Sequence, residues 1–259
     1  MKTPSLTLAA PPEMSFEAAE YGRVAHLAYQ FDGRGRLIRT QMPQVKPNAI
    51  MALCHSGRDL PDIDRKALLN QFLREIGARK YSAVLADIEG SASEEMRSLL
   101  RFLAAELEQR RIPLWVPETC AEDMPDTVRV IISSAISGGS YTERLKSAAG
   151  KWGLGRLILE AERNCEDFLL PSPDGIGRRL SFRQLDNMFI KKMPSPFFSP
   201  DLCTYYFTYR DENRRPHFVL FDNANSMRRK LSAAAELGIR DAVLLYPEVR
   251  DIIADILAQ

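Results

Sequence analysis

The alternation of strand-like and helix-like segments constrains the fold of this chain more than any other feature. Short runs rich in valine, isoleucine and leucine recur, and most are followed by a polar turn and a segment with helical spacing. This order is typical of βα units that build a parallel sheet. Eight runs are predicted as strands: 5–10, 24–31, 48–54, 82–89, 113–118, 129–136, 156–162 and 242–247. Because eight parallel strands can close without leaving an edge, we expect an α/β protein with a (β/α)8 TIM barrel.

Helices are predicted in the segments between these strands. Ser91 stands three residues before Glu94, the spacing of a capping box, and a helix with one apolar face then runs to residue 107. A similar apolar pattern covers residues 68–76. Ser226 is expected to cap a last long helix, which stops at Gly238. Each of these helices is expected to cover the outside of the barrel.

A length of 259 residues with 45% hydrophobic content suits one barrel domain over residues 1–259. The alternation of strands and helices is interrupted between the seventh and eighth predicted strands, where an insertion covers about residues 165–223. It holds a proline-rich loop (171–200) and two alternating runs around the polar turn "RDENRR". This pattern predicts an inserted β-hairpin, and such excursions often shape the mouth of a barrel.

Charge and hydropathy exclude several classes of partner. The chain has 35 basic and 34 acidic side chains, and its basic pairs are scattered among acids, which argues against nucleic acid. No apolar run has the length of a signal peptide or a membrane span, so we expect a soluble, unexported protein. The oligomeric state stays open.

Neither cysteines nor histidines predict a metal site or a disulfide framework. The residues concerned are well separated in the sequence: Cys54, Cys120, Cys165 and Cys203, and His26, His55 and His217. We therefore expect reduced thiols, packed or hydrogen-bonded histidines, and no metal or other cofactor.

The fourth predicted strand ends in two acids, in "YSAVLADIEG". Residues two apart in a strand face the same way, so Asp87 and Glu89 share a face at the carboxyl end, where barrel enzymes carry their chemistry. Two neighbouring carboxyls compete to ionise, which favours one proton donor and one anion, as glycosidic bond cleavage requires. The alternative is that both are helix caps or solvated loop residues.

Several stretches resemble the family-18 glycoside hydrolases. The segment from Tyr81 to Glu118 is similar to the fourth βα unit of that family, whose strand ends in Asp-x-Glu. The stretch "FTYRDENRRPHFVLFDNANSMRRKLSAAAELGIRDAVLLYP" is similar to the end of the peptidoglycan and spore-cortex branch, and "HLAYQFDGRGRLI" and "NAIMALCHSG" to its second and third strands. The resemblance covers most of the chain.

This resemblance implies a substrate-assisted, retaining hydrolysis of N-acetylglucosamine linkages, in which the acetamido oxygen of the substrate attacks the anomeric carbon. Glu89 matches the acid that protonates the leaving oxygen, and Asp87 matches the aspartate that orients the acetamide. A glycan is then the expected partner, and the expected site of action is the cytoplasm or the spore.

The chain departs from the family pattern at three strands. Ser82 and Ala83 stand in place of the first Asp-Gly of the motif, and Leu85 stands where many members have Asp or Asn. "VIISSAISGG" replaces a Tyr-Asp sequence on the sixth strand, and the terminal tryptophan is missing. Other residues are then expected to contact the glycan from strand ends or from the hairpin: Tyr29, His55, Glu118, Ser133, Glu160, Glu162, Tyr209, Asp222 and Tyr246. A non-hydrolytic glycan-binding or scaffold barrel is the rival reading. A third reading is an enzyme that binds a phosphorylated metabolite at "SGGSYTER".

Overall fold

The computed structural model describes residues 3–32, 34–40, 45–56, 60, 62–90, 92–172 and 175–258, without the side chain of Glu89. Its largest sheet is a closed ring of parallel strands, because β1 pairs with both β2 and β14. The ring contains β1 (Ser5–Ala10), β2 (Arg23–Phe31), β4 (Ile50–Ser56), β5 (Ala83–Glu89), β6 (Leu114–Pro117), β7 (Arg129–Ser133), β8 (Leu157–Glu160) and β14 (Asp241–Leu245). The predicted TIM barrel is confirmed. A short strand, β3 (Leu37–Arg39), pairs antiparallel with β2 outside the ring.

Side-chain alternation divides the barrel strands between two layers. Inward residues fill the barrel with small and bulky apolar groups in turn: Ala9, Ala25, Ile50, Ala52, Ala83, Leu85, Trp115, Ile131, Ile158 and Val243. The residues between them join a larger core between strands and helices. Since this interior is packed with side chains, open space for a ligand is expected only at the barrel ends.

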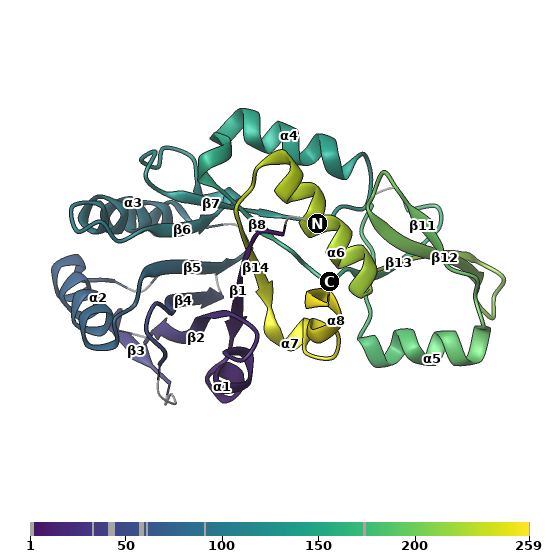
Figure 1. Ribbon diagram of the computed structural model, residues 1–259, viewed down its shortest axis with the longest axis horizontal. Helices are drawn as coiled ribbons and strands as arrows, with labels where there is room; N and C mark the ends of the chain where they lie inside the picture. The colour runs from purple at the N-terminus through teal and green to yellow at the C-terminus, as the bar shows by residue number, and fades with distance from the viewer. Residues whose placement is uncertain are drawn as a thin grey trace.

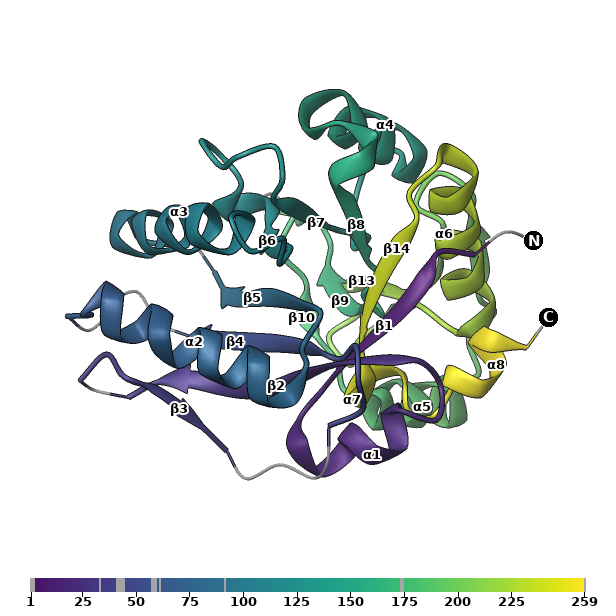
Figure 2. The ribbon, with the colours of Figure 1, turned by 60° about the vertical axis from the view of Figure 1, so that its left-hand side comes forward.

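Helices cover the outside of the ring (Figures 1 and 2). They are α1 (Ser15–Ala18), α2 (Arg65–Arg79), α3 (Glu94–Glu108), α4 (Tyr141–Trp152), α6 (Ala224–Leu237), α7 (Tyr246–Val249) and α8 (Ile253–Leu257), with 3-10 turns η1 (Pro12–Met14), η2 (Glu118–Cys120) and η3 (Leu154–Arg156). Within the described ranges, none of the helices combines the length and apolarity needed to cross a membrane.

Two helix starts differ from the sequence prediction. The residue that caps α3 is Ser93, whose hydroxyl accepts from the Met96 amide at 3.2 Å, whereas Ser91 lies outside the described residues. Asn223 caps α6, and Ser226 takes the third helical position, where its hydroxyl accepts from the Asn223 amide at 3.0 Å. Asn and Ser are both strong N-cap residues, so residue type alone does not decide between Asn223 and Ser226 as the cap of α6.

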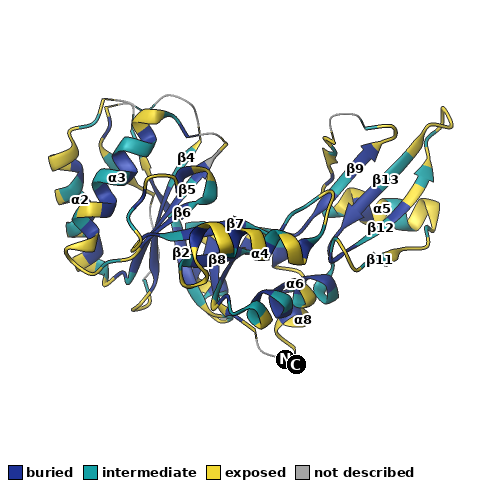
Figure 3. Cartoon of the chain, turned by 90° about the horizontal axis from the view of Figure 1, so that it is seen from above, coloured by how far each residue is buried: buried dark blue, intermediate teal, exposed yellow. Residues whose placement is uncertain are grey.

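The insertion between β8 and β14 contains the predicted hairpin as β12 (Thr204–Arg210) and β13 (Pro216–Phe221). Three further strands complete an antiparallel sheet: β9 (Cys165–Leu169), β10 (Arg178–Arg179) and β11 (Phe197–Ser199). Helix α5 (Phe182–Lys192) packs on this sheet, and Leu185, Phe207 and Val219 are buried in a separate small core. Figure 3 shows the insertion projecting from one side of the barrel.

Candidate functional site: an acidic cavity at the barrel mouth

A cavity of about 690 Å³ opens at the carboxyl ends of the barrel strands. Its floor is the inner packing of the barrel, and its rim carries charged side chains. The main lining residues are Ala9, Leu27, Leu85, Asp87, Ile131, Glu160, Glu162, Arg179, Val243, Leu245 and Glu248. This volume and position are typical of small-molecule sites in TIM barrels.

Asp87 reaches this cavity because of the alternation along β5. Ala83 and Leu85 point into the barrel, and Asp87 follows them on the same face at the top of the strand. Glu89 ends β5 opposite Ser56 of β4, but its side chain lies outside the described residues. Gly90 then turns the chain away with a φ of 76°, a conformation that glycine adopts without strain.

Glu160 and Glu162 bring two more carboxyls to the cavity from the end of β8. Ser134, at the end of the neighbouring strand β7, accepts a hydrogen bond from the Glu162 amide at 3.0 Å and so fixes the backbone there. Burial, and to a smaller extent the charges of Glu162, Asp87 and Glu248, raise the pKa of Glu160 to about 7. Near neutral pH this carboxyl is therefore half protonated.

Glu248 and Arg179 complete the charged rim, and sequence reasoning missed both. Arg179 comes from β10 of the insertion and forms an ion pair with Glu248, which follows the last barrel strand. Burial raises the pKa of Glu248, whereas the Arg179 charge lowers it. Glu248 could have been recognised from the sequence, because it directly follows the eighth predicted strand. The position of Arg179 depends on how the insertion folds back.

Three predicted residues point away from the cavity: Tyr29 and His55, on the outer faces of β2 and β4, and Tyr246, at the start of α7. A register shift between Leu27 and Tyr29 turns Tyr29 outward, where it is buried and its hydroxyl donates to Glu75 at 3.0 Å. His55 lies one residue after an inward position of β4, and the centroids of the His55 and Phe31 rings are 6.2 Å apart. Tyr246 is fully buried on the outer side, while its neighbour Leu245 lines the cavity. The expectation that Tyr29, His55 and Tyr246 contact a glycan in this cavity is therefore corrected.

Four other predicted residues are also absent from the described cavity lining, and their polar groups bond elsewhere in the protein. The Ser133 hydroxyl accepts from the Ala135 amide at 3.0 Å. Glu118 accepts from the indole of Trp152 at 3.0 Å and pairs with an arginine of α4. Tyr209 and Asp222 belong to the insertion, where Tyr209 donates to Asp167 at 2.8 Å and Asp222 pairs with a buried lysine. Of the predicted set, Asp87, Glu160 and Glu162 meet in the cavity.

The segment "SGGSYTER" forms the start of α4. Two amides that a phosphate would use are already bonded: Tyr141 donates to the Asp201 carbonyl at 2.7 Å, and Glu143 to the Ser140 hydroxyl at 3.4 Å. A capped helix start accounts for this stretch, so the structure adds no support to the phosphate reading.

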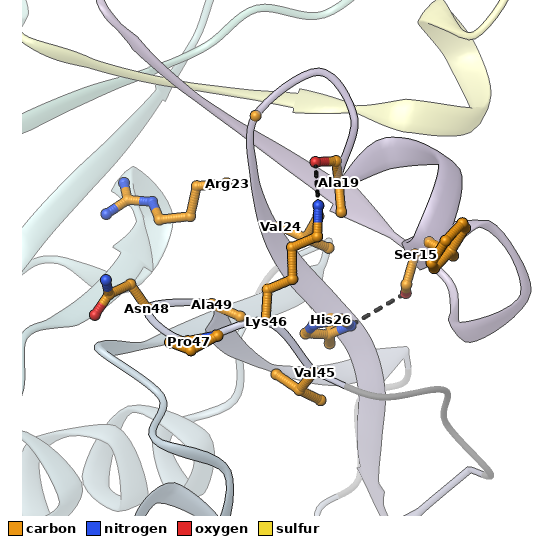
Figure 4. A pocket seen from close by; sticks show the side chains of 12 residues that line it. Ser15, Ala19, Arg23, Val24, His26, Val45, Lys46, Pro47, Asn48 and Ala49 are labelled. Carbon is orange, nitrogen blue, oxygen red and sulfur yellow. Dashed lines mark hydrogen bonds between the residues drawn. The ribbon is translucent and has the colours of Figure 1, made fainter.

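A second cavity, of about 410 Å³, lies near the start of β2 and the segment that precedes β4 (Figure 4). The fold engages two of its polar side chains: Lys46 donates to the Ala19 carbonyl at 2.9 Å, and His26 lies 3.1 Å from the Ser15 hydroxyl. Burial lowers the pKa of His26 to about 4, with a smaller effect from Arg79, so this ring is neutral at physiological pH. The barrel mouth is therefore the better candidate site.

The fold and the cavity define a (β/α)8 barrel with an acidic mouth and an inserted antiparallel sheet. No family model and no curated protein matches the sequence. Known structures do match. The spore cortex-lytic enzyme SleL of Bacillus cereus has a TM-score of 0.70 at 13% identity, over 100% of this chain and 76% of that one.

Two chitinases match over nearly their full length. The chitinase of Chromobacterium violaceum has a TM-score of 0.68 at 14% identity, with 99% of each chain covered. The class V chitinase of Nicotiana tobaccum has a TM-score of 0.66 at 8% identity, again with 99% of each chain covered. Similarity at these identities establishes the shared barrel fold.

Proposed function

We propose that this protein is a glycoside hydrolase that cleaves β-linked N-acetylglucosamine glycans of the peptidoglycan or chitin type. The observation that carries the proposal is the position of Asp87, at the carboxyl end of β5 in a 690 Å³ cavity that Glu160 and Glu162 also line. Three further observations support it: the Asp-x-Glu ending of the same strand, the resemblance to family-18 glycoside hydrolases, and the fold shared with a chitinase and a spore cortex-lytic enzyme.

The proposed reaction is substrate-assisted and retaining. Glu89 donates a proton to the leaving glycosidic oxygen while the acetamido oxygen of the substrate attacks the anomeric carbon, so the C–O bond breaks and a cyclic oxazolinium ion forms. Asp87 orients the acetamide and stabilises its positive charge. Glu89 then takes a proton from water, which attacks the same carbon, opens the ring and restores the acetamide.

The charge of the mouth suits this reaction. The oxazolinium intermediate is cationic, and carboxylates at Asp87 and Glu162 in a half-enclosed cavity stabilise positive charge more strongly than water does. Glu160, half protonated near pH 7, adds a group that both donates and accepts hydrogen bonds.

The experiment is to incubate the protein with N-acetylglucosamine oligomers and muropeptides and to detect new reducing ends by mass spectrometry. Proton NMR of the first products then gives the anomeric configuration. The proposal predicts new ends with retained β configuration. Inverted products would contradict the mechanism.

The same samples test the rival reading of a non-hydrolytic, glycan-binding barrel. If no new ends form across a broad pH range in folded protein, while calorimetry still measures binding of the oligomers, the protein binds glycans without cleaving them. If the oligomers are neither bound nor cleaved, both readings are wrong.

A further inference from the structure

Among the described residues, the lining of the barrel mouth holds more carboxyl groups than cations. Four described carboxyls line the cavity, at Asp87, Glu160, Glu162 and Glu248, beside one guanidinium, at Arg179. Arg179 is paired with Glu248. Within the described residues, the side chains of Glu160 and Glu162 have no ion pair and no hydrogen bond partner that would take up their charge.

This arrangement of carboxyl groups is electrostatically costly. Like charges in a partly buried cavity repel one another, and the pKa of Glu160 rises to about 7 because burial and three neighbouring acids disfavour its anion. A cation placed between Glu160 and Glu162 would remove this cost. The cavity therefore favours a positively charged group over a neutral one of the same size.

An organic cation fits the cavity better than a metal ion. Among the described residues, no three histidine, cysteine, aspartate or glutamate side chains are placed to hold a metal. The cavity is also far larger than an ion, at about 690 Å³, and has an apolar floor that includes Leu27, Leu85 and Val243. Such a site holds a ring-sized group with apolar faces and one charged substituent.

We propose that the barrel mouth binds a glucosamine unit with a free, protonated amino group, held by the carboxylates of Glu160 and Glu162, so that the substrate is a partly de-N-acetylated glycan. This inference rests on the proposed function and names the substrate class of the same site. The amine-bearing unit lies beside the acetylated unit that reacts, because the reaction itself needs an acetamide. Binding of the ammonium favours the anion of Glu160, so a net proton is released below pH 7, where the amine and Glu160 are both protonated before binding.

Binding is measured by calorimetry in the Glu89→Gln background, which prevents turnover. The ligands are the fully acetylated N-acetylglucosamine tetramer and tetramers that lack one acetyl group. We expect a de-N-acetylated tetramer to bind about five-fold tighter at low salt, with a difference that shrinks as salt rises. Titrations in buffers of different ionisation enthalpy are expected to show proton release for that ligand alone.

Adding Glu162→Gln to the Glu89→Gln protein is expected to abolish the tighter binding of the de-N-acetylated tetramer. The matched control is Glu236→Gln, on the exposed side of α6 far from the cavity, which is expected to keep it. Equal affinity for both ligands, or a preference that survives Glu162→Gln, would overturn the amine site and leave the proposed function standing. Failure to bind either ligand would overturn both.

Discussion

Asp222 and Lys230 form an ion pair in the interior of the protein, with 2.6 Å between the carboxylate Oδ2 and Nζ and side chains that are 0% and 1% exposed. Asp222 follows the last strand of the insertion, and Lys230 lies on α6, which returns to the barrel. The Thr204 hydroxyl and the backbone N–H of Asn164 also donate hydrogen bonds to the Asp222 carboxylate, each at 2.9 Å. The pair therefore fixes the insertion to the barrel, and Asp222 has a structural role.

Removing one partner of this pair is expected to be strongly destabilising, because the other charge stays buried without compensation. Asp222→Asn or Lys230→Met should each lower the free energy of unfolding in urea by about 3–5 kcal/mol. The double variant should lose less than the sum. Asp255→Asn, at an exposed position of α8, is the control and should change it by less than about 0.5 kcal/mol. Single-variant losses below about 1 kcal/mol would contradict the structural role.

Glu160 is expected to make stability depend on pH. Its folded pKa of about 7 exceeds the ordinary value of 4.5, so between these values the folded state holds more protons than the unfolded state. Stability from this group is therefore present below pH 4.5 and is lost as pH rises from 4.5 through 7, by about 3 kcal/mol. Glu160→Gln should remove this dependence.

Thermal unfolding of wild type and Glu160→Gln between pH 4.5 and 8.5 checks this prediction, and comparing the two cancels the other titrating groups. The Tm of the variant should overtake that of wild type as pH rises. Parallel Tm curves for the two proteins would show that Glu160 has an ordinary pKa.

A substitution of Glu118 tests whether this residue stabilises the fold or takes part in the reaction. It lies outside the described cavity lining and bonds Trp152 and Arg144, so Glu118→Gln should cost about 1 kcal/mol of stability. Turnover of a glycan by the folded variant should stay within about two-fold of wild type. A ten-fold loss of kcat/KM at unchanged KM would instead assign Glu118 to the reaction.

The sequence predicted the barrel because local patterns determine it. Each predicted strand overlaps an observed one, for example 82–89 against Ala83–Glu89, since apolar runs and polar turns mark strands directly. In the insertion, only the hairpin was predicted. Strands β10 and β11 contain two and three residues, too few to show alternation, and they are ordered by pairing with segments distant in sequence.

The site was predicted only in part, because a shift of one residue reverses the direction of a strand side chain. Asp87, Glu160 and Glu162 follow inward residues in simple alternation and lie at the cavity, while their contact with a glycan stays a prediction. Tyr29 follows a bulge that the sequence does not reveal. Arg179 reaches the mouth through long-range folding of the insertion, which local reasoning cannot follow.

The central claim is that the acids ending β5 cleave a glycan, and the most direct test is the kcat/KM of Glu89→Gln on the N-acetylglucosamine tetramer, with Glu236→Gln as the matched control. Loss of a general acid should lower kcat/KM by about 10²–10⁴-fold, while the control stays near wild type. Wild-type turnover that survives unchanged in Glu89→Gln would contradict the account.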